Sequence, residues 1–337
     1  MAPGSVFPLT EDAPKFEDLS GLEIKPGDNP YDALINACHG SAAEMQARYA
    51  THRATRNAQQ RGNFLTPEFK GLSIDPILLR LENPDIEPGF KDPRNCLVFW
   101  ARPPDHIVRL ASHLQTLLAK AAPGLWLMPA HRLHLTTLEV AHSRTAEEIA
   151  SLVSALRPAL PAMAGLTFAR RSRLVKPMIS YDLSAVAVSF LPASGEEVLS
   201  PPPAPLSSDH VGQNGQNGQP DQSTAEDPDA YTYHHLRRDV FTMASEKVAI
   251  ASRYVVPSAH ITIGRFLTQK DHETPEQRER WIRTIEDINK WLEDEVWDVK
   301  DGEFLGEWMV GKERGLEARC GTLWYGGGRT ILAGEGF

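Results

Sequence analysis

The sequence has few cysteines and no long apolar stretch. Its three cysteines, Cys38, Cys96 and Cys320, are widely spaced along 337 residues. An odd, scattered set argues against a disulfide framework or a Cys-x-x-Cys zinc site, and it indicates a reducing compartment. No apolar run approaches the ~20 residues that span a bilayer. The first residues, MAPGSVFPLT, lack the basic and apolar regions of a secretory signal. We therefore expect a cytoplasmic or nuclear protein without a membrane partner.

Basic residues are absent from residues 194–230, where seven side chains are acidic. These acids account for most of the net charge of −9, so the rest of the chain is nearly neutral. A nearly neutral surface is a poor match for the phosphates of a long nucleic acid, although a local pocket can hold a short nucleotide. The same segment contains PPPAP and GQNGQNGQ and almost no apolar residues, which predicts a disordered insertion.

The remaining composition is typical of a folded protein, with 41% hydrophobic and 23% charged residues. Residues 1–29 are rich in proline, glycine and acids and predict an extended arm. Residues 30–60 predict two helices that break at Gly40–Ser41, and the prolines of residues 61–94 predict irregular chain. We therefore divide the chain into an N-terminal arm with a helical extension, 1–94, and a main domain, 95–337.

Hydrophobic periodicity in the main domain predicts helices and strands in alternation. The expected strands cover 95–102, 125–128, 133–140, 166–173, parts of 178–190, 255–266 and a hairpin near the C-terminal end. The expected helices begin near Asp105, Thr145, Tyr231 and Thr274. Capping boxes at Thr145 and Thr274 mark two of these starts.

One four-residue pattern occurs twice in matching surroundings. HLTT at 134–137 and HITI at 260–263 each follow a predicted helix, lie on a predicted strand and precede a capped helix. Because side chains alternate along a strand, the histidine and the first threonine of each copy share one face. If a pseudo-two-fold axis relates the two halves, both polar pairs can line one cleft.

Two opposed histidines suit the cleavage of a phosphodiester. A neutral imidazole can take a proton from the attacking water or hydroxyl, while an imidazolium gives a proton to the leaving oxygen. Both protonation states are accessible near neutral pH, since the usual pKa of histidine is about 6.5. Hydroxyl groups can hold the nonbridging phosphate oxygens. This chemistry requires no metal or other cofactor.

Two HxTx copies, one in each half, are the signature of the 2H phosphoesterases. Residues 95–337 resemble this superfamily, and they look most like its fungal RNA ligase/cyclic nucleotide phosphodiesterase-like members. HITIGR at 260–265 is close to the second motif of bacterial 2′-5′ RNA ligase-like members. The resemblance implies an α+β, bilobal fold, in which two pseudo-two-fold-related antiparallel sheets with outer helices surround a central cleft. It also implies metal-independent action on 2′,3′-cyclic phosphates or related RNA ends.

Carried onto this sequence, the resemblance makes His134 and His260 the catalytic pair and Thr136 and Thr262 the phosphate-binding pair. Thr137 departs from the motif, which usually has an apolar residue there, and we expect this to affect packing alone.

Three further residues are weaker candidates. Arg265 is a candidate phosphate ligand or a surface residue. It follows His260 by five residues, so strict alternation places it on the opposite face unless a bulge at Gly264 turns it back. Trp324 and Tyr325 could stack on a base, or they could belong to the core of a hairpin.

We expect a monomeric, metal-independent phosphodiesterase that opens 2′,3′-cyclic phosphates of nucleosides or short oligonucleotides. The partner is then a small nucleotide or a short RNA end, with no long nucleic acid. One alternative is an RNA-end processing enzyme, a 3′-exonuclease or a 2′-5′ RNA ligase. A second alternative is a non-catalytic nucleotide-binding module on the same fold. The exact substrate, the acid and base roles of the histidines, and the role of residues 1–94 stay open at this stage.

Overall fold

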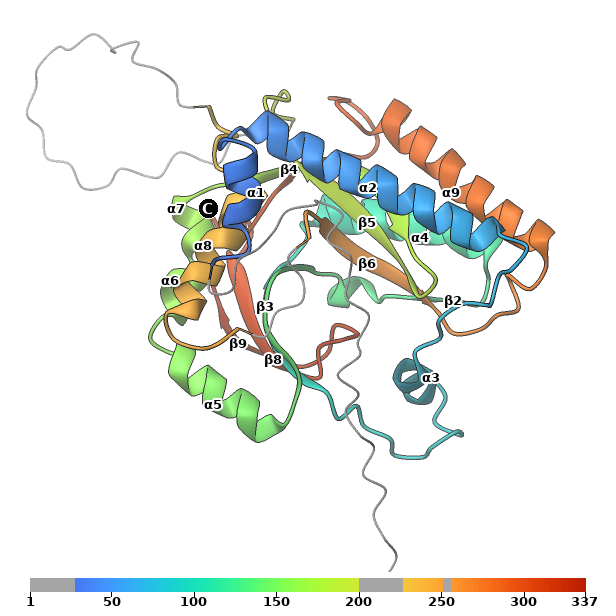
Figure 1. Ribbon diagram of the computed structural model, residues 1–337, viewed down its shortest axis with the longest axis horizontal. Helices are drawn as coiled ribbons and strands as arrows, with labels where there is room; N and C mark the ends of the chain where they lie inside the picture. Colours follow the sequence, from blue (N-terminus) through green and yellow to red (C-terminus); the bar gives the residue numbers. More distant parts are fainter. Residues whose placement is uncertain (1–27, 200–226, 251–255) are drawn as a thin grey trace, which may run out of the picture.

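The computed structural model describes residues 28–199, 227–250 and 256–337. Nearly all of the expected N-terminal arm and most of the expected insertion at 194–230 lie outside these residues. The described residues form a mixed α+β protein built on a curled antiparallel sheet, with helices on its outer side (Figure 1).

The sheet has nine strands in the order β7-β4-β5-β6-β3-β1-β8-β9, and β2 also pairs with β6. The strands are β1 (Asn95–Ala101), β2 (Leu125–Leu127), β3 (Leu135–Arg144), β4 (Arg173–Tyr181), β5 (Ala185–Pro192), β6 (Ala259–Phe266), β7 (Trp308–Met309), β8 (Leu316–Gly321) and β9 (Arg329–Ala333). The α-helices are α1 (Asp32–Ala37), α2 (Ala42–Leu65), α3 (Pro76–Glu82), α4 (Asp105–Ala121), α5 (Ala146–Leu156), α6 (Leu160–Ala164), α7 (Leu166–Ala169), α8 (Tyr233–Ser245) and α9 (Pro275–Glu295).

The sheet has two halves that meet where β3 pairs with β6. We call β2, β4, β5, β6 and β7 the β6 half, and β1, β3, β8 and β9 the β3 half. Their junction is the antiparallel pair Leu135–Ile261. The two separate sheets expected from the sequence are therefore one continuous sheet, because the edge strands of the halves hydrogen-bond to each other.

The helix that precedes each motif in the chain packs on the half of the sheet that holds the other motif. Helix α4 comes before HLTT in the chain but packs on β2, β6 and α9, in the β6 half. Helix α8 comes before HITI but packs on β3. Helix α5 covers β1, β3 and β8. Each motif strand is thus supported by a helix that comes from the other half of the sequence.

Side-chain caps fix where the main helices begin. The capping boxes predicted at Thr145 and Thr274 are both confirmed, and they start α5 and α9. The break predicted at Gly40–Ser41 is also confirmed, since the Ser41 hydroxyl accepts from the backbone N–H of Glu44 at the start of α2. Such caps satisfy N–H groups that have no partner inside the helix.

Two sequence predictions were wrong. Residues 61–94 are not irregular throughout, because α2 continues to Leu65 and α3 begins after Asp75. The Asp75 carboxylate caps α3 by accepting from the backbone N–H groups of Ile77 and Leu78. The strand expected within 166–173 is not formed there, because helix α7 takes Leu166–Ala169 and strand β4 begins only at Arg173. A four-residue apolar run has no periodicity that separates helix from strand.

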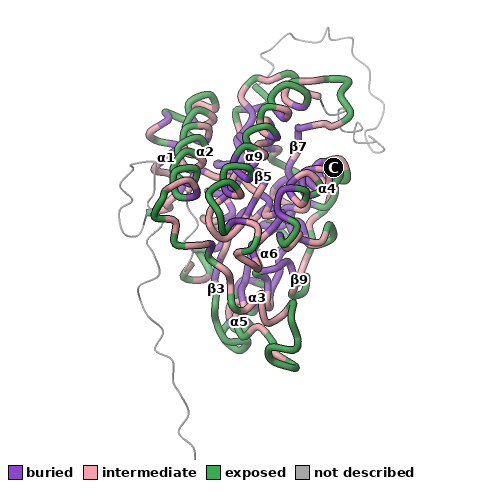
Figure 2. The backbone as a smooth tube through the Cα atoms, turned by 90° about the vertical axis from the view of Figure 1, so that its right-hand side faces the viewer, coloured by how far each residue is buried: buried purple, intermediate pink, exposed green. Residues whose placement is uncertain are grey.

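The hydrophobic core takes in residues from both sides of position 94. Met45, Tyr49 and Phe64 of α2 are at most 2% exposed and belong to the same apolar cluster as the central strands. Helix α2 packs on β4, β5 and α9 (Figure 1). Figure 2 shows buried strands in the interior and exposed residues on the outer sides of α2 and α5. The helical extension is therefore part of the packed structure.

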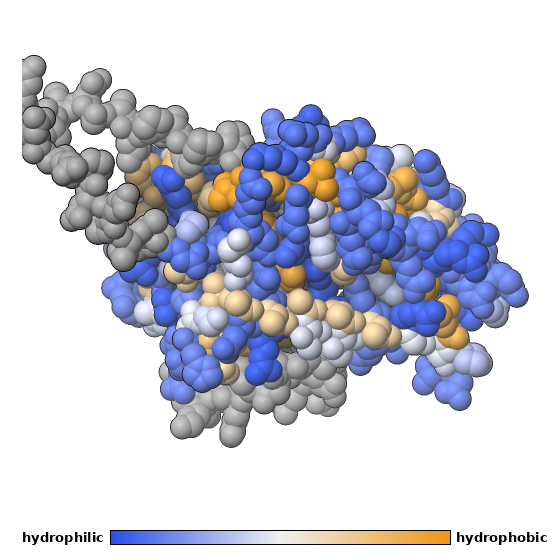
Figure 3. Space-filling model, turned by 90° about the horizontal axis from the view of Figure 1, so that it is seen from above, coloured by the Kyte–Doolittle hydropathy of each residue, from blue (hydrophilic) through white to orange (hydrophobic). Residues whose placement is uncertain are grey.

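The surface seen from above in Figure 3 is mainly hydrophilic, and its apolar groups form small separate patches. Within the described ranges, no helix is both long and apolar enough to cross a membrane. The three cysteines are buried and form no disulfide.

A buried ion-pair network centred on Arg173 of β4 lies where the two ends of the expected insertion meet the sheet. The Arg173 guanidinium bonds the carboxylates of Asp229 and Glu307 at 2.6 Å, and all three side chains are at most 2% exposed. It also donates to the backbone carbonyls of Glu196 and Glu197. One guanidinium thus holds the two described ends of the expected insertion, 194–199 and 227–230, against β4.

We predict that Arg173→Met destabilises the protein by about 3–5 kcal/mol, because it leaves two buried carboxylates without their cation. Urea unfolding measures this loss. The control is Arg61→Gln, which removes an exposed ion pair with Glu286 and should cost less than about 1 kcal/mol. Similar losses in the two variants would contradict the role assigned to the network.

Candidate active site

The junction between the halves brings the two motifs together. Leu135 and Ile261 are paired across β3 and β6. Counting one residue in each direction along antiparallel strands places His134 opposite Thr262 and Thr136 opposite His260. Directly opposite side chains have Cβ atoms about 4.5–5.5 Å apart and share one face of the sheet. The four polar residues predicted from the sequence therefore meet on one face.

Each motif strand has a bulge at the fourth residue of the motif. On β6, Ala187 pairs with Thr262 and Val186 pairs with Gly264, so Ile263 is an extra residue. Burial along β6 follows the same shift: His260, Thr262 and Arg265 are partly exposed, while the residues between them are buried. The bulge thus returns Arg265 to the face of His260, one of the two placements that the sequence left open.

The bulge on β3 occupies the corresponding position. Trp100 pairs with Thr136 and Phe99 pairs with Leu138, so Thr137 is the extra residue. Thr137 is fully buried, in keeping with a role in packing. Beyond this bulge Glu139 turns to the cleft face, at the position that Arg265 has on β6. The two strands are therefore alike in backbone but carry opposite charges after the bulge.

His134 is held by a hydrogen bond and by an aromatic stack. Its Nδ1 lies 2.7 Å from the carbonyl oxygen of Arg132. Because a carbonyl only accepts, Nδ1 carries the hydrogen, and Nε2 has a lone pair when the ring is neutral. The ring stacks on Trp100 with centroids 3.7 Å apart and an interplanar angle of 16°.

Two arginines lie close to the Trp100 ring of this stack. The guanidinium groups of Arg102 and Arg319 lie 4.9 and 5.0 Å from the ring centre of Trp100, and both bond the carboxylate of Glu317. Burial lowers the pKa of His134 to about 3, and the positive charges of Arg102 and Arg319 act in the same direction. His134 is thus neutral at neutral pH in the free protein.

His260 has a different environment. Its Nδ1 lies 3.0 Å from the hydroxyl oxygen of Ser258, which can donate or accept. Burial and then the charge of Arg237 lower the pKa of His260 to about 4, while the Asp182 carboxylate acts in the opposite direction. His260 thus has a carboxylate near it that favours the protonated ring.

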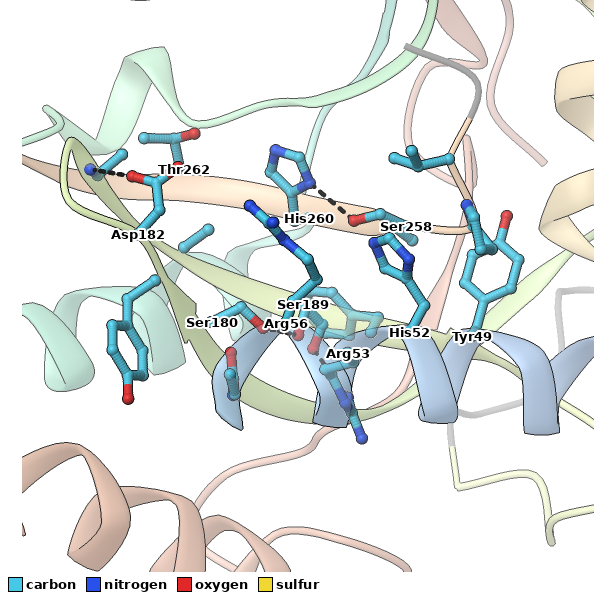
Figure 4. A pocket seen from close by; sticks show the side chains of 18 residues that line it. Tyr49, His52, Arg53, Arg56, Ser180, Asp182, Ser189, Ser258, His260 and Thr262 are labelled. Atoms are coloured by element: carbon cyan, nitrogen blue, oxygen red, sulfur yellow. Dashed lines mark hydrogen bonds between the residues drawn. The ribbon is translucent and has the colours of Figure 1, made fainter. Parts of the chain in front are cut away.

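Each histidine lines its own cavity, and Thr262 lines both. The His134 cavity has a volume of about 150 Å³, and its walls combine aromatic and apolar side chains with charged and hydroxyl groups. It is lined by Cys96, Val98, Trp100, Met128, His134, Thr136, Glu139, Thr262, Arg265, Leu323 and Trp324. The His260 cavity encloses about 180 Å³ between β5, β6 and helix α2, and Figure 4 shows its side chains.

Of the three weaker candidates, two line the His134 cavity and one does not. Arg265 lines the His134 cavity, and its Nε atom is buried without a hydrogen-bond partner among the described residues. Trp324 lines the same cavity and is 37% exposed, with the Arg94 guanidinium 4.5 Å from its ring centre. Tyr325 is 6% exposed, lines neither of these two cavities and bonds Asp75 and Arg94 through its hydroxyl.

Sequence reasoning missed Trp100, Glu139 and the side chains of α2 that line the His260 cavity. Glu139 could have been found by aligning the two motifs, because it stands five residues after His134 as Arg265 does after His260. The contribution of α2 had no signal in the sequence, since its partners on β4 and β5 are more than a hundred residues away. Among the described residues, no group of three or more His, Cys, Asp or Glu side chains could hold a metal ion.

Comparisons with known proteins do not show a family, so a functional assignment depends on the residues described above. No family model matches the chain, and no curated protein matches it. A solved structure of TT0787 of Thermus thermophilus is similar in part, with 17% identity and a TM-score of 0.31. The match covers 51% of this chain and 75% of that chain.

We predict that both histidines titrate well below the usual pKa of about 6.5 in the free protein, because burial and nearby cations disfavour their charged forms. NMR of the ring Cε1–Hε1 groups, assigned with His134→Gln and His260→Gln, measures this. Inorganic phosphate should raise both pKa values, since an anion favours the charged ring. Titration of both rings near pH 6.5 without phosphate would contradict the prediction.

Proposed function

We propose that the chain is a 2H-type phosphodiesterase that opens 2′,3′-cyclic phosphates of nucleosides or short oligonucleotides by hydrolysis. The observation that carries the proposal is the register at Leu135–Ile261, which sets two histidines and two threonines on one face of the sheet. The matching bulges at the fourth residue of the two motifs support a pseudo-two-fold relation between the halves, and hence a bilobal arrangement of this family.

His134 is suited to be the general base. Its Nδ1–H is committed to the carbonyl of Arg132, so Nε2 can accept a proton from water. Burial and the cations near Trp100 keep the ring neutral. As the water oxygen forms its bond to phosphorus, the proton of that water moves to His134.

His260 is suited to be the general acid. The Asp182 carboxylate favours its charged form, whereas the charges of Arg102 and Arg319 disfavour the charged form of His134. Environments that push the pKa values of two groups apart are a guide to which acts as acid and which as base. As the bond between phosphorus and the 2′ or 3′ oxygen breaks, His260 gives that oxygen its proton. Water is consumed, and a phosphomonoester and a free hydroxyl remain.

Three groups can bind the phosphate during this exchange. Thr136 and Thr262 each stand opposite one of the histidines, within reach of an oxygen on the same phosphorus. Arg265 adds a buried donor without a partner in the His134 cavity. Such donors stabilise the charge that develops on the nonbridging oxygens. Trp324 and the apolar wall of this cavity suit a nucleobase.

We predict that His134→Ala and His260→Ala each lower turnover of uridine 2′,3′-cyclic phosphate by about a hundredfold or more, because each removes one proton-transfer group. Steady-state kinetics measures the loss, and binding of a non-hydrolysed nucleotide should persist. His131→Ala is the matched control, since His131 is exposed three residues before the catalytic position. Two alanine variants as active as the parent would overturn the proposal.

A substrate with a better leaving group separates the two roles. A p-nitrophenyl phosphodiester releases a phenolate that needs no proton. His260→Ala should therefore lose much less activity on this substrate than on the cyclic phosphate, while His134→Ala loses the same on both. The reverse pattern would exchange the roles of the two histidines.

We predict that kcat/KM rises as the pH falls from 8 towards 5. The active form has a neutral base and a protonated acid, and a pKa of about 4 leaves His260 mostly unprotonated at neutral pH. Each unit of acidification then raises the protonated fraction by up to about tenfold. A pH–rate profile at low substrate concentration tests this. A maximum at pH 7 or above would contradict the assignment.

A further inference from the structure

We propose that helix α2 builds a second phosphate-binding subsite in the His260 cavity, so that the preferred substrate is the cyclic-phosphate end of a short RNA rather than a mononucleotide. The subsite would bind the phosphodiester on the 5′ side of the terminal nucleotide. The inference rests on the proposed function and names the substrate class of the same site.

Two side chains of α2 point to the catalytic strand. His52 and Arg56 are one helical turn apart, so they project from the same face of α2. Both line the His260 cavity, and Figure 4 shows them extending from the helix towards His260. His52 is close enough to lower the pKa of His260 by its charge. The Arg56 guanidinium also donates to the Gln59 side chain at 2.7 Å, so a cation and an imidazole stand in the wall of the cavity that His260 lines.

The helix that carries them is fixed by polar bonds to the sheet. The buried Arg53 guanidinium points away from the cavity and donates to the backbone carbonyls of Lys176 and Ser189. The Asn57 amide donates to the carbonyl of Ile179. These bonds hold α2 in one register, so the position of Arg56 in the wall of the cavity follows from the packing of the helix and not from a loop.

Part of the wall of the His260 cavity carries groups that suit a phosphate, although Tyr49, Tyr181 and Phe190 line it as well. Its polar lining includes Arg56, Ser180 and Ser258. Its one carboxylate, Asp182, accepts from the backbone N–H groups of Ser184 and Ala185. The His134 cavity places the indoles of Trp100 and Trp324 beside charged and hydroxyl side chains. An arginine beside hydroxyl groups binds phosphate oxygens well, and charge-assisted bonds of this kind are about twice as strong as neutral ones.

The two cavities share one wall residue, Thr262, and an RNA end could pass from one to the other there. Thr262 lines both, and it stands opposite His134 between them. With the terminal base against Trp324 and the cyclic phosphate between the histidines, the strand continues past Thr262. The next phosphate then enters the cavity that Arg56 lines.

The test compares the cyclic phosphate of a uridine dinucleotide with uridine 2′,3′-cyclic phosphate. For the parent, the ratio of their kcat/KM values should favour the dinucleotide. Arg56→Gln should lower this ratio by roughly tenfold, since it removes one charge-assisted contact made by the dinucleotide alone. Arg61→Gln on the same helix is the matched control, because Arg61 lines neither cavity and pairs with Glu286 at the surface. It should leave the ratio unchanged.

A neutral linkage completes a thermodynamic cycle. When the internucleotide phosphate is replaced by methylphosphonate, the parent should lose about the same factor as the Arg56→Gln variant loses on the ordinary dinucleotide. In the Arg56→Gln variant the replacement should have little further effect, because the partner of the charge is already gone.

The outcomes separate the two levels of the proposal. Equal losses on both substrates in Arg56→Gln, or additive effects of the variant and the neutral linkage, would overturn the subsite and leave the proposed function standing. A parent that turns over neither substrate would overturn the proposed function and the subsite with it.

Discussion

The pairing of Leu135 with Ile261 is the constraint on which the site depends. Both side chains are almost fully buried behind the cleft. A slip of one residue would expose them and turn the histidines and threonines into the core, since strand register decides which face each side chain occupies. The apolar residue between histidine and threonine in each motif therefore has a physical role, because it holds the register that points the polar residues into the cleft.

The two bulges extend this arrangement and make it asymmetric. Each makes the fourth residue of the motif an extra residue in its strand, so a third side chain per strand returns to the cleft face. On one strand this residue is Glu139 and on the other it is Arg265. Together with Arg102 and Arg319 near His134, the asymmetry gives the cleft a local charge pattern that the net charge of −9 does not reveal. Local potentials of this kind can differ in sign from the whole molecule.

The sequence was informative where local chemistry decides the outcome. Thr145 and Thr274 cap helices through bonds within four residues, and alternation along a strand gave the shared face of each motif. Predictions failed where contacts between residues far apart in the chain determine the structure. Leu166–Ala169 has no periodicity of its own, and the joining of two sheets into one depends on a single pair 126 residues apart in the chain. The stacking of Trp100 on His134 also had no local signal, because it follows from the pairing of β1 with β3.

The N-terminal extension is the clearest example of this limit, and it bears on function. Composition marked residues 1–94 as separate from the main domain, yet α2 contributes Met45, Tyr49 and Phe64 to the common core. The buried Arg53 ties α2 to β4 and β5 through backbone carbonyls that have no sequence requirement. A helix attached in this way keeps its position while its cavity-facing residues vary. The paired histidines can then supply the chemistry of bond cleavage, and α2 can determine which phosphodiesters reach them.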